Sequence, residues 1–241
     1  MSKTLSREAI ERYRRDGFLF PVRVLSPAEA GRYRERLEAV ERAQGGPLRG
    51  ELRHKTHLLF TWLDALVRHP VILDAVEDIL GPNLMVWSSS FFIKEARDPA
   101  FVSWHQDATY WGLSEPDVAT AWVAFTDSSI ESGAQRMIPG THHEQIRHRD
   151  TFAPQNLLSR GQEIEVEVDE ARAVDIVLAP GEMSLHHVRI FHGSPPNRSG
   201  HFQPEQPPEA DLAPAAVARH ATIMKRQGEI LYRGTAGERF R

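Results

Sequence analysis

The feature that most constrains the fold is a change of sequence pattern at Leu84. From there to Gly200, short runs rich in β-branched and aromatic residues alternate with turn residues at roughly 8–12-residue spacing. No helical stretch separates these runs, which favours an antiparallel sandwich or jelly roll over a parallel α/β sheet. We therefore predict a mainly β core with strands near residues 84–94, 101–107, 118–126, 135–138, 163–168, 174–178 and 184–192.

The residues before this core have a helical pattern. Ser26-Pro27-Ala28-Glu29 forms a capping box with proline at the first helical position, and Gly45 suits the end of that helix. A second helix is predicted from Val71 to Leu80, where apolar residues recur at helical spacing and Gly81-Pro82 follows.

The residues after the core change pattern again. His201 to Pro214 reads as an irregular, proline-rich connection, and Ala215 to Tyr232 as a closing helix. The 241 residues are consistent with a single domain over 1–241, made of a helical part (1–80), a jelly-roll core (84–200) and the final segment (201–241).

Composition excludes several kinds of protein. The absence of cysteine excludes disulfides, thiolate metal sites and cysteine nucleophiles. A net charge of −4 and a pI near 6.3 give no support for nucleic-acid binding. No apolar run approaches the ~20 residues of a membrane span, and no apolar signal core opens the chain. We expect a cytoplasmic protein, a monomer or small homo-oligomer, with a small-molecule partner. Four lysines among 29 basic residues suggest GC-rich, bacterial codon usage.

Without thiolates, a metal ion must be held by histidines and carboxylates. His105 and Asp107 are two residues apart, and such residues leave the same face of a strand. This pattern alone is weak, because a chain with 12 histidines often contains one by chance. His192 ends a second predicted strand. Two imidazoles and one carboxylate occupy three coordination positions and leave the others open, as in non-haem Fe(II) oxygenases, whereas a structural site takes four protein ligands.

Five stretches of the chain resemble the phytanoyl-CoA dioxygenase family of Fe(II)/2-oxoglutarate oxygenases. They are SWHQDATYWGL (103–113), ATAWVAFTD (119–127), SGAQRMIPGTHH (132–143), GEMSLHH (181–187) and FHGSPPNRS (191–199). The resemblance implies a double-stranded β-helix, the cupin-like jelly roll, with N-terminal and C-terminal helices packed outside.

The resemblance also implies the residues of the site. His105, Asp107 and His192 match the iron ligands, Trp122 a tryptophan that lines the cosubstrate pocket, and Ser194 a hydroxyl that holds 2-oxoglutarate. Ser90 and Phe92 match more loosely, on the strand that enters this pocket. The implied reaction uses Fe(II), 2-oxoglutarate and O2 to hydroxylate, cyclise or desaturate a small molecule, such as a natural product.

One departure from the family is expected to matter. The family has an arginine about ten residues after the last ligand histidine, where it pairs with the far carboxylate of 2-oxoglutarate, but Phe202, Gln203 and Pro204 stand there. The eighth strand that a jelly roll requires is also missing from the pattern. We predict a segment omitted between Gly200 and His201, with Arg219 or Arg226 as substitutes if the chain is continuous.

The remaining candidates stay open. His186 lies six residues before His192, so one continuous strand would place it about 20 Å away, out of reach of the same iron. Tyr110 and Trp111 are equally compatible with covering a substrate pocket and with plain packing. Two other functions remain: a non-oxidative metal-dependent isomerase or hydrolase, and a metal-binding pseudoenzyme on the same barrel.

Overall fold

The computed structural model describes residues 2–48, 50–112 and 117–199. Its α-helices are α1 (Arg7–Asp16), α2 (Pro27–Gln44), α3 (Thr61–Val67), α4 (Pro70–Leu80) and α5 (Ala108–Trp111). Its strands are β1 (Phe18–Arg23), β2 (Val102–His105), β3 (Ala119–Val123), β4 (Arg136–Ile138), β5 (His148–Asp150), β6 (Gln162–Ile164), β7 (Val174–Asp175), β8 (Glu182–His187) and β9 (Phe191–Ser194).

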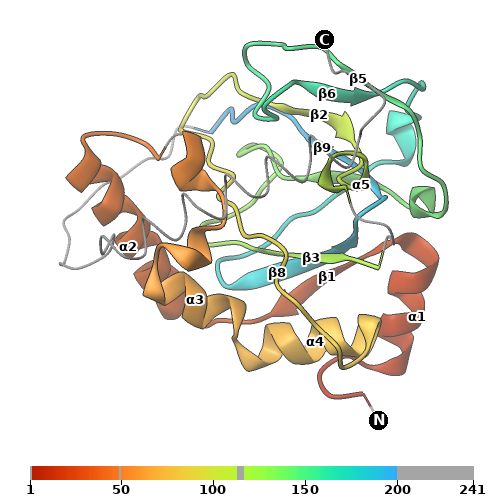
Figure 1. Cartoon of the computed structure of the whole chain (residues 1–241), viewed down its shortest axis with the longest axis horizontal. Helices are drawn as coiled ribbons and strands as arrows, with labels where there is room; N and C mark the ends of the chain where they lie inside the picture. Colours follow the sequence, from red (N-terminus) through yellow and green to blue (C-terminus); the bar gives the residue numbers. More distant parts are fainter. Residues whose placement is uncertain (1, 49, 113–116, 200–241) are drawn as a thin grey trace.

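The strands form antiparallel sheets, as the sequence predicts. One sheet has the order β1-β8-β3 and a second has the order β2-β9-β4-β7, while β5 and β6 form a separate hairpin. Helices α3 and α4 lie along the outer side of the first sheet, and the second sheet lies beyond its other side (Figure 1). The described residues therefore form a helix layer and two sheet layers.

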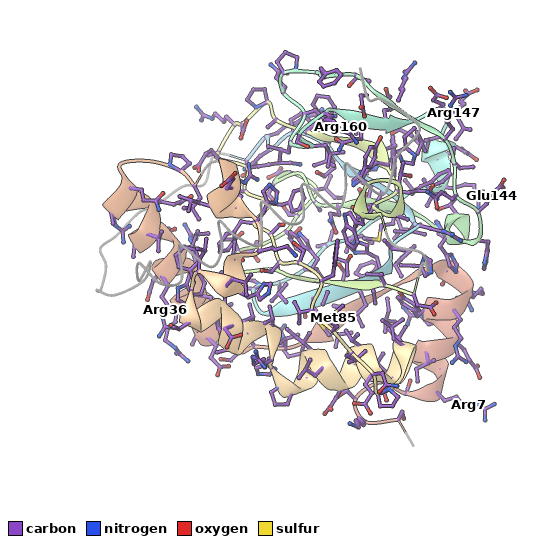
Figure 2. The ribbon with its side chains drawn as sticks, viewed as in Figure 1. Arg7, Arg36, Met85, Glu144, Arg147 and Arg160 are labelled. Carbon is purple, nitrogen blue, oxygen red and sulfur yellow. The ribbon has the colours of Figure 1, made fainter. Side chains whose placement is uncertain are left out.

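The alternation of side chains along β8 explains these layers. Met183 and Leu185 belong to the larger apolar cluster, which also includes Trp62, Leu66 and Ala75 of the helical part. Ser184 and His186, at the alternate positions, are equally buried but face away from that cluster. A smaller apolar cluster lies on the side of this sheet that faces the second sheet. Its members are Phe18, Ala124, Met137, Ile176, Leu178 and Ile190. Charged side chains such as Arg7, Arg36 and Arg147 project outward (Figure 2).

The predicted helix ends are confirmed. The Ser26 hydroxyl accepts from the Glu29 amide at 3.3 Å, while the Glu29 carboxylate accepts from the Ser26 amide at 2.9 Å. Gly45 ends α2 with a left-handed φ of 78°, which glycine adopts without steric cost. The second predicted helix, 71–80, is observed as α4.

Two strand predictions are wrong, and two observed strands, β1 and β5, have no counterpart among the predicted ones. Residues 84–94 form no strand, only a single bridge between Ser90 and His54. The predicted strand 184–192 is two strands in different sheets, β8 and β9, because the chain reverses at 188–190, where the Ile190 amide donates to the His187 carbonyl at 2.9 Å. The region predicted to be helical also contains strand β1, which pairs antiparallel with β8.

Strand β9 itself is flanked by β2 and β4. Among the described residues, β1 and β3 are the edge strands of the first sheet and β2 and β7 those of the second, so an open edge lies at β2, the strand next to His192. The Gly200–His201 join, Arg219, Arg226 and the closing helix lie outside the described residues. No helix in the described part of the chain is both long and apolar enough to cross a membrane.

Candidate metal centre

The pairing of β2 with β9 brings His105 and His192 together. The two residues are opposite each other in the register, and their ring centroids are 4.0 Å apart. Gly193 permits this approach, because a Cβ there would lie only 2.8 Å from the Val102 carbonyl oxygen. The predicted convergence, across 85 positions between Asp107 and His192, is therefore observed.

Asp107 reaches the same point, but not by the predicted route. Strand β2 ends at His105, and Asp107 has helical backbone angles (φ −61°, ψ −36°) at the N-cap position of α5. A turn rather than a two-residue strand repeat thus directs its carboxylate. One Asp107 oxygen lies 3.4 Å from His105 Nε2 and 3.9 Å from His192 Nε2.

The backbone leaves the metal-binding nitrogens available. His105 Nδ1 lies 2.9 Å from the Ser103 carbonyl oxygen, and His192 Nδ1 lies 3.0 Å from the Ile190 carbonyl oxygen. A carbonyl only accepts, so each Nδ1 carries the hydrogen and each Nε2 presents a lone pair toward Asp107. Ligand atoms of all three residues lie within 4.8 Å of one another, which suits one shared cation.

Protonation states also suit a cation. Burial lowers the pKa of His192 to about 3, so its imidazole is neutral at pH 7. Burial alone would raise the pKa of Asp107, but its close contact with His105, at 3.4 Å, and the neighbouring imidazoles lower it to about 2. Neutral imidazoles and an ionised carboxylate are the forms that bind metals.

Gln106 lies between the ligands His105 and Asp107, in the connection from β2 to α5, and holds this segment in place. It is fully buried, and its amide nitrogen donates to the carbonyls of Glu144 (2.7 Å) and Arg189 (2.6 Å). Its amide oxygen accepts from the Ile146 backbone at 2.7 Å. One side chain thus ties the ligand segment to the 144–146 loop and to the reversal that precedes β9.

His186 contradicts the sequence prediction. Its ring centroid lies 4.9 Å from that of His192, and its Nε2 lies 4.0 Å from Asp107 Oδ2, not about 20 Å from the centre. The estimate assumed one straight strand, whereas the reversal at 188–190 folds β9 back over β8. His186 is 1 % exposed, and burial lowers its pKa to about 4.

The other predicted residues differ in their placement. Trp122, on β3 opposite Ser184, packs against the smaller apolar cluster. Ser194 lies two residues after His192 on β9, so both side chains leave the same face. Ser90 and Phe92 do not lie on a strand: Ser90 Oγ contacts His54 Nδ1 at 3.1 Å, and Phe92 is 45 % exposed. Among the described residues, neither side chain forms a hydrogen bond with His105, Asp107 or His192.

Tyr110 lies on α5 directly after the ligand segment. Its ring meets the His148 ring edge-on at 5.6 Å, and the Arg160 guanidinium lies 4.7 Å from its centroid. His148 Nε2 in turn accepts from the backbone N–H of Gln106 at 2.9 Å. Tyr110 therefore packs against His148, which supports the backbone of the ligand segment at Gln106.

Sequence reasoning missed the roles of Gln106 and His186 at the centre, and that of Lys94 beside Ser194. Lys94 is a lone cation that follows the apolar run Phe91-Phe92-Ile93, which was the available signal for a special role. Gln106 gave no signal beyond its place between two ligands. The reversal that brings His186 in has no glycine or proline at 188–190 to mark it.

Two antiparallel sheets that present two histidines and one carboxylate define the class of mononuclear non-haem metal proteins with open coordination positions. The chain belongs to the phytanoyl-CoA dioxygenase family, whose sequence pattern matches residues 13–204.

Individual relatives agree with this assignment. A probable alpha-ketoglutarate-dependent hypophosphite dioxygenase of Stutzerimonas stutzeri is 32% identical over 59% of this chain and 50% of its own length. The L-proline trans-4-hydroxylase of Streptomyces griseoviridis is 30% identical over 61% of this chain and 59% of its own. The chain thus spans about half the length of these curated relatives.

Solved structures match over more of the chain. The non-heme monooxygenase ThoJ in its apo form has a TM-score of 0.79 and 34% identity, covering 95% of this chain and 100% of its own. CytC3 with Fe(II) and alpha-ketoglutarate has a TM-score of 0.59 and 27% identity, covering 83% and 74%.

Proposed function

We propose that this protein is an Fe(II)- and 2-oxoglutarate-dependent oxygenase that oxidises a C–H bond of a small molecule. The observation that carries the proposal is the convergence of His105, Asp107 and His192, with both Nε2 atoms directed at the carboxylate. Relatives named as alpha-ketoglutarate-dependent dioxygenase and hydroxylase support the same chemistry. Hydroxylation is the simplest outcome, and cyclisation and desaturation are alternative outcomes of the same C–H oxidation.

The three residues would hold the iron, which when bound supplies the activation of O2 and the oxidation of the substrate. His105 and His192 contribute neutral nitrogens, and Asp107 contributes the charge. Three ligands leave three positions for the cosubstrate and O2. Trp122 would wall the cosubstrate pocket and Ser194 would hold a carboxylate of 2-oxoglutarate, as the family resemblance implies.

We propose further that the two sheets are the halves of a double-stranded β-helix in one oxygenase domain. The interleaved order β2-β9-β4-β7 and the shared centre at β2 and β9 support this topology. The TM-score of 0.79 to ThoJ supports the cupin-like fold over nearly the whole chain.

The substrate is proposed to be a small molecule rather than a coenzyme A thioester. No basic groove was expected from the charge balance of −4, and the relatives named above include enzymes for hypophosphite and L-proline. A cytoplasmic location and a monomer or small homo-oligomer remain predictions.

The test is an anaerobic titration of the purified protein with Fe(II) and then 2-oxoglutarate, followed by O2. We expect a metal-to-ligand charge-transfer band that decays as succinate is released. Asp107→Ala should give no band, whereas Asp127→Ala, the same change at an exposed position, should behave as wild type. No band in the wild type would favour the non-oxidative isomerase or hydrolase. A band without succinate release would favour the pseudoenzyme.

A further inference from the structure

Lys94 places a partly buried ammonium group beside Ser194. Its Nζ donates to Ser194 Oγ at 2.6 Å, to the Gly133 carbonyl at 3.2 Å and to the Pro195 carbonyl. These acceptors account for all three ammonium hydrogens.

The environment of this cation lacks a paired anion. Within residues 2–48, 50–112 and 117–199 no carboxylate oxygen lies within 4.0 Å of Nζ, and the three acceptors are neutral. Burial lowers the pKa of Lys94 to about 8, against the opposing effect of Asp98. A partly buried charge satisfied only by neutral oxygens gains from an anion that binds nearby.

The contact also determines how Ser194 bonds. Since the ammonium group has no lone pair, Ser194 Oγ is the acceptor in this bond, and its own hydrogen is left to donate elsewhere. Ser194 shares a strand face with His192 and lies two residues, roughly 6–7 Å, further along the strand. A five-carbon diacid anchored at the metal by one end would bring its other carboxylate to about this distance.

We propose that Lys94 is a positioning residue for the cosubstrate: its ammonium holds the Ser194 hydroxyl as a donor toward the carboxylate of 2-oxoglutarate that lies away from the metal, and adds positive charge there. This inference rests on the proposed function. Lys94 acts through Ser194 and does not replace the carboxylate-pairing arginine expected from the family, whose candidates lie outside the described residues.

The surrounding backbone is built to hold Lys94 in place. Asn197, in the segment after β9, donates to the carbonyls of Lys94 (3.3 Å) and Glu95 (2.9 Å). Gly133 has a φ of +78°, and a Cβ there would meet the Pro195 carbonyl and lie 3.1 Å from Lys94 Nζ. These contacts fix the ammonium with respect to β9.

The experiment measures affinity for two 2-oxo acids in the Fe(II)-loaded, anaerobic protein, read from the charge-transfer band. 2-Oxoglutarate carries the far carboxylate and pyruvate lacks it. The ratio of the Kd for pyruvate to the Kd for 2-oxoglutarate therefore measures how much the far carboxylate contributes to binding. Lys94→Met should raise the Kd for 2-oxoglutarate roughly 10- to 100-fold, the loss expected for a charged hydrogen bond. The Kd for pyruvate should change less than about twofold.

Further variants separate positioning from general damage. In a Ser194→Ala background, Lys94→Met should cost much less than in the wild type, because the two residues act together. Lys3→Met, the same change at an exposed lysine, should leave the ratio unchanged. If Lys94→Met does not fold, Lys94→Gln replaces it as the test, because glutamine keeps an N–H donor without the charge. This variant should still raise the Kd for 2-oxoglutarate several-fold relative to the Kd for pyruvate.

Two results would overturn the inference: an unchanged ratio in a folded Lys94 variant, or equal losses for 2-oxoglutarate and pyruvate. The absence of any charge-transfer band in the wild-type protein would instead count against the proposed function. The two failures are therefore distinguishable.

Discussion

Replacing Gln106 by methionine should destabilise the protein strongly, although Gln106 is not itself a proposed metal ligand. Methionine has a similar length and no polar atoms. The substitution removes the three side-chain hydrogen bonds that Gln106 makes to Glu144, Arg189 and Ile146.

The magnitude follows from the groups left behind. Two carbonyls and one amide would lose their partner at a fully buried position, and each unsatisfied group costs about 1–3 kcal/mol. Burying an apolar side chain offsets about 1–2 kcal/mol of this. Three such groups cost about 3–9 kcal/mol, so the net loss lies between about 1 and 8 kcal/mol. We expect the free energy of unfolding to fall by about 3–5 kcal/mol, near the middle of that range and at the upper end of single substitutions.

Urea unfolding of the metal-free protein measures the loss. With a slope near 3 kcal/mol per molar urea, the midpoint should fall by roughly 1–1.7 M. Gln145→Met is the matched control: Gln145 is exposed and makes one long contact, at 3.4 Å, to Thr109 Oγ1. Its free energy of unfolding should change by no more than an ordinary surface substitution does, about 0.5 kcal/mol.

A loss below about 1 kcal/mol for Gln106→Met, or one no larger than that of Gln145→Met, would refute the reasoning. Such a result would mean that the 144–146 loop and the 188–190 reversal keep their places without Gln106.

Three further predictions follow from single contacts. Asp107→Ala should abolish retention of Fe(II), measured as bound metal after gel filtration. It should leave the urea midpoint nearly unchanged, because little apolar area is lost. Unchanged retention of Fe(II) would contradict the assignment of Asp107 as a ligand. Burial lowers the pKa of His187 in the folded protein to about 4, from an ordinary value of 6.5. Between pH 4 and 6.5 the unfolded chain therefore binds more protons than the folded protein does. Stability should thus be lost as pH falls from about 6.5 to 4, and His187→Asn should flatten this slope in urea titrations at several pH values. Ser26→Ala should cost about 1 kcal/mol by removing the α2 capping box, seen as a lower Tm; an unchanged Tm would show that the cap contributes nothing.

Local chemistry made some features readable from the sequence. The start and end of α2 follow from Ser26, Glu29 and Gly45, whose side chains or backbone freedom satisfy the helix ends wherever the helix lies. The apolar spacing of 71–80 predicts α4 for the same reason. The residue types of the centre were also readable, since a chain without cysteine leaves histidine and carboxylate as the metal donors.

Strand prediction succeeded less well, because strand formation depends on partners distant in the chain. Residues 84–94 have the composition of a strand, yet among the described residues they find only the bridge from Ser90 to His54. β1 was overlooked inside a helical region because its partner, β8, lies more than 150 residues later.

The sequence by itself determined which residues could carry the chemistry, and the tertiary structure decided where they meet. His105, Asp107 and His192 were readable as donors, but their meeting depends on the β2–β9 register and on a turn at Asp107 that no local pattern specifies. His186 and Lys94 show the same limit: one was placed far from the centre and the other was given no role. Both reach the site through a chain reversal and long-range packing, whose energies arise from contacts between segments that the local sequence does not encode.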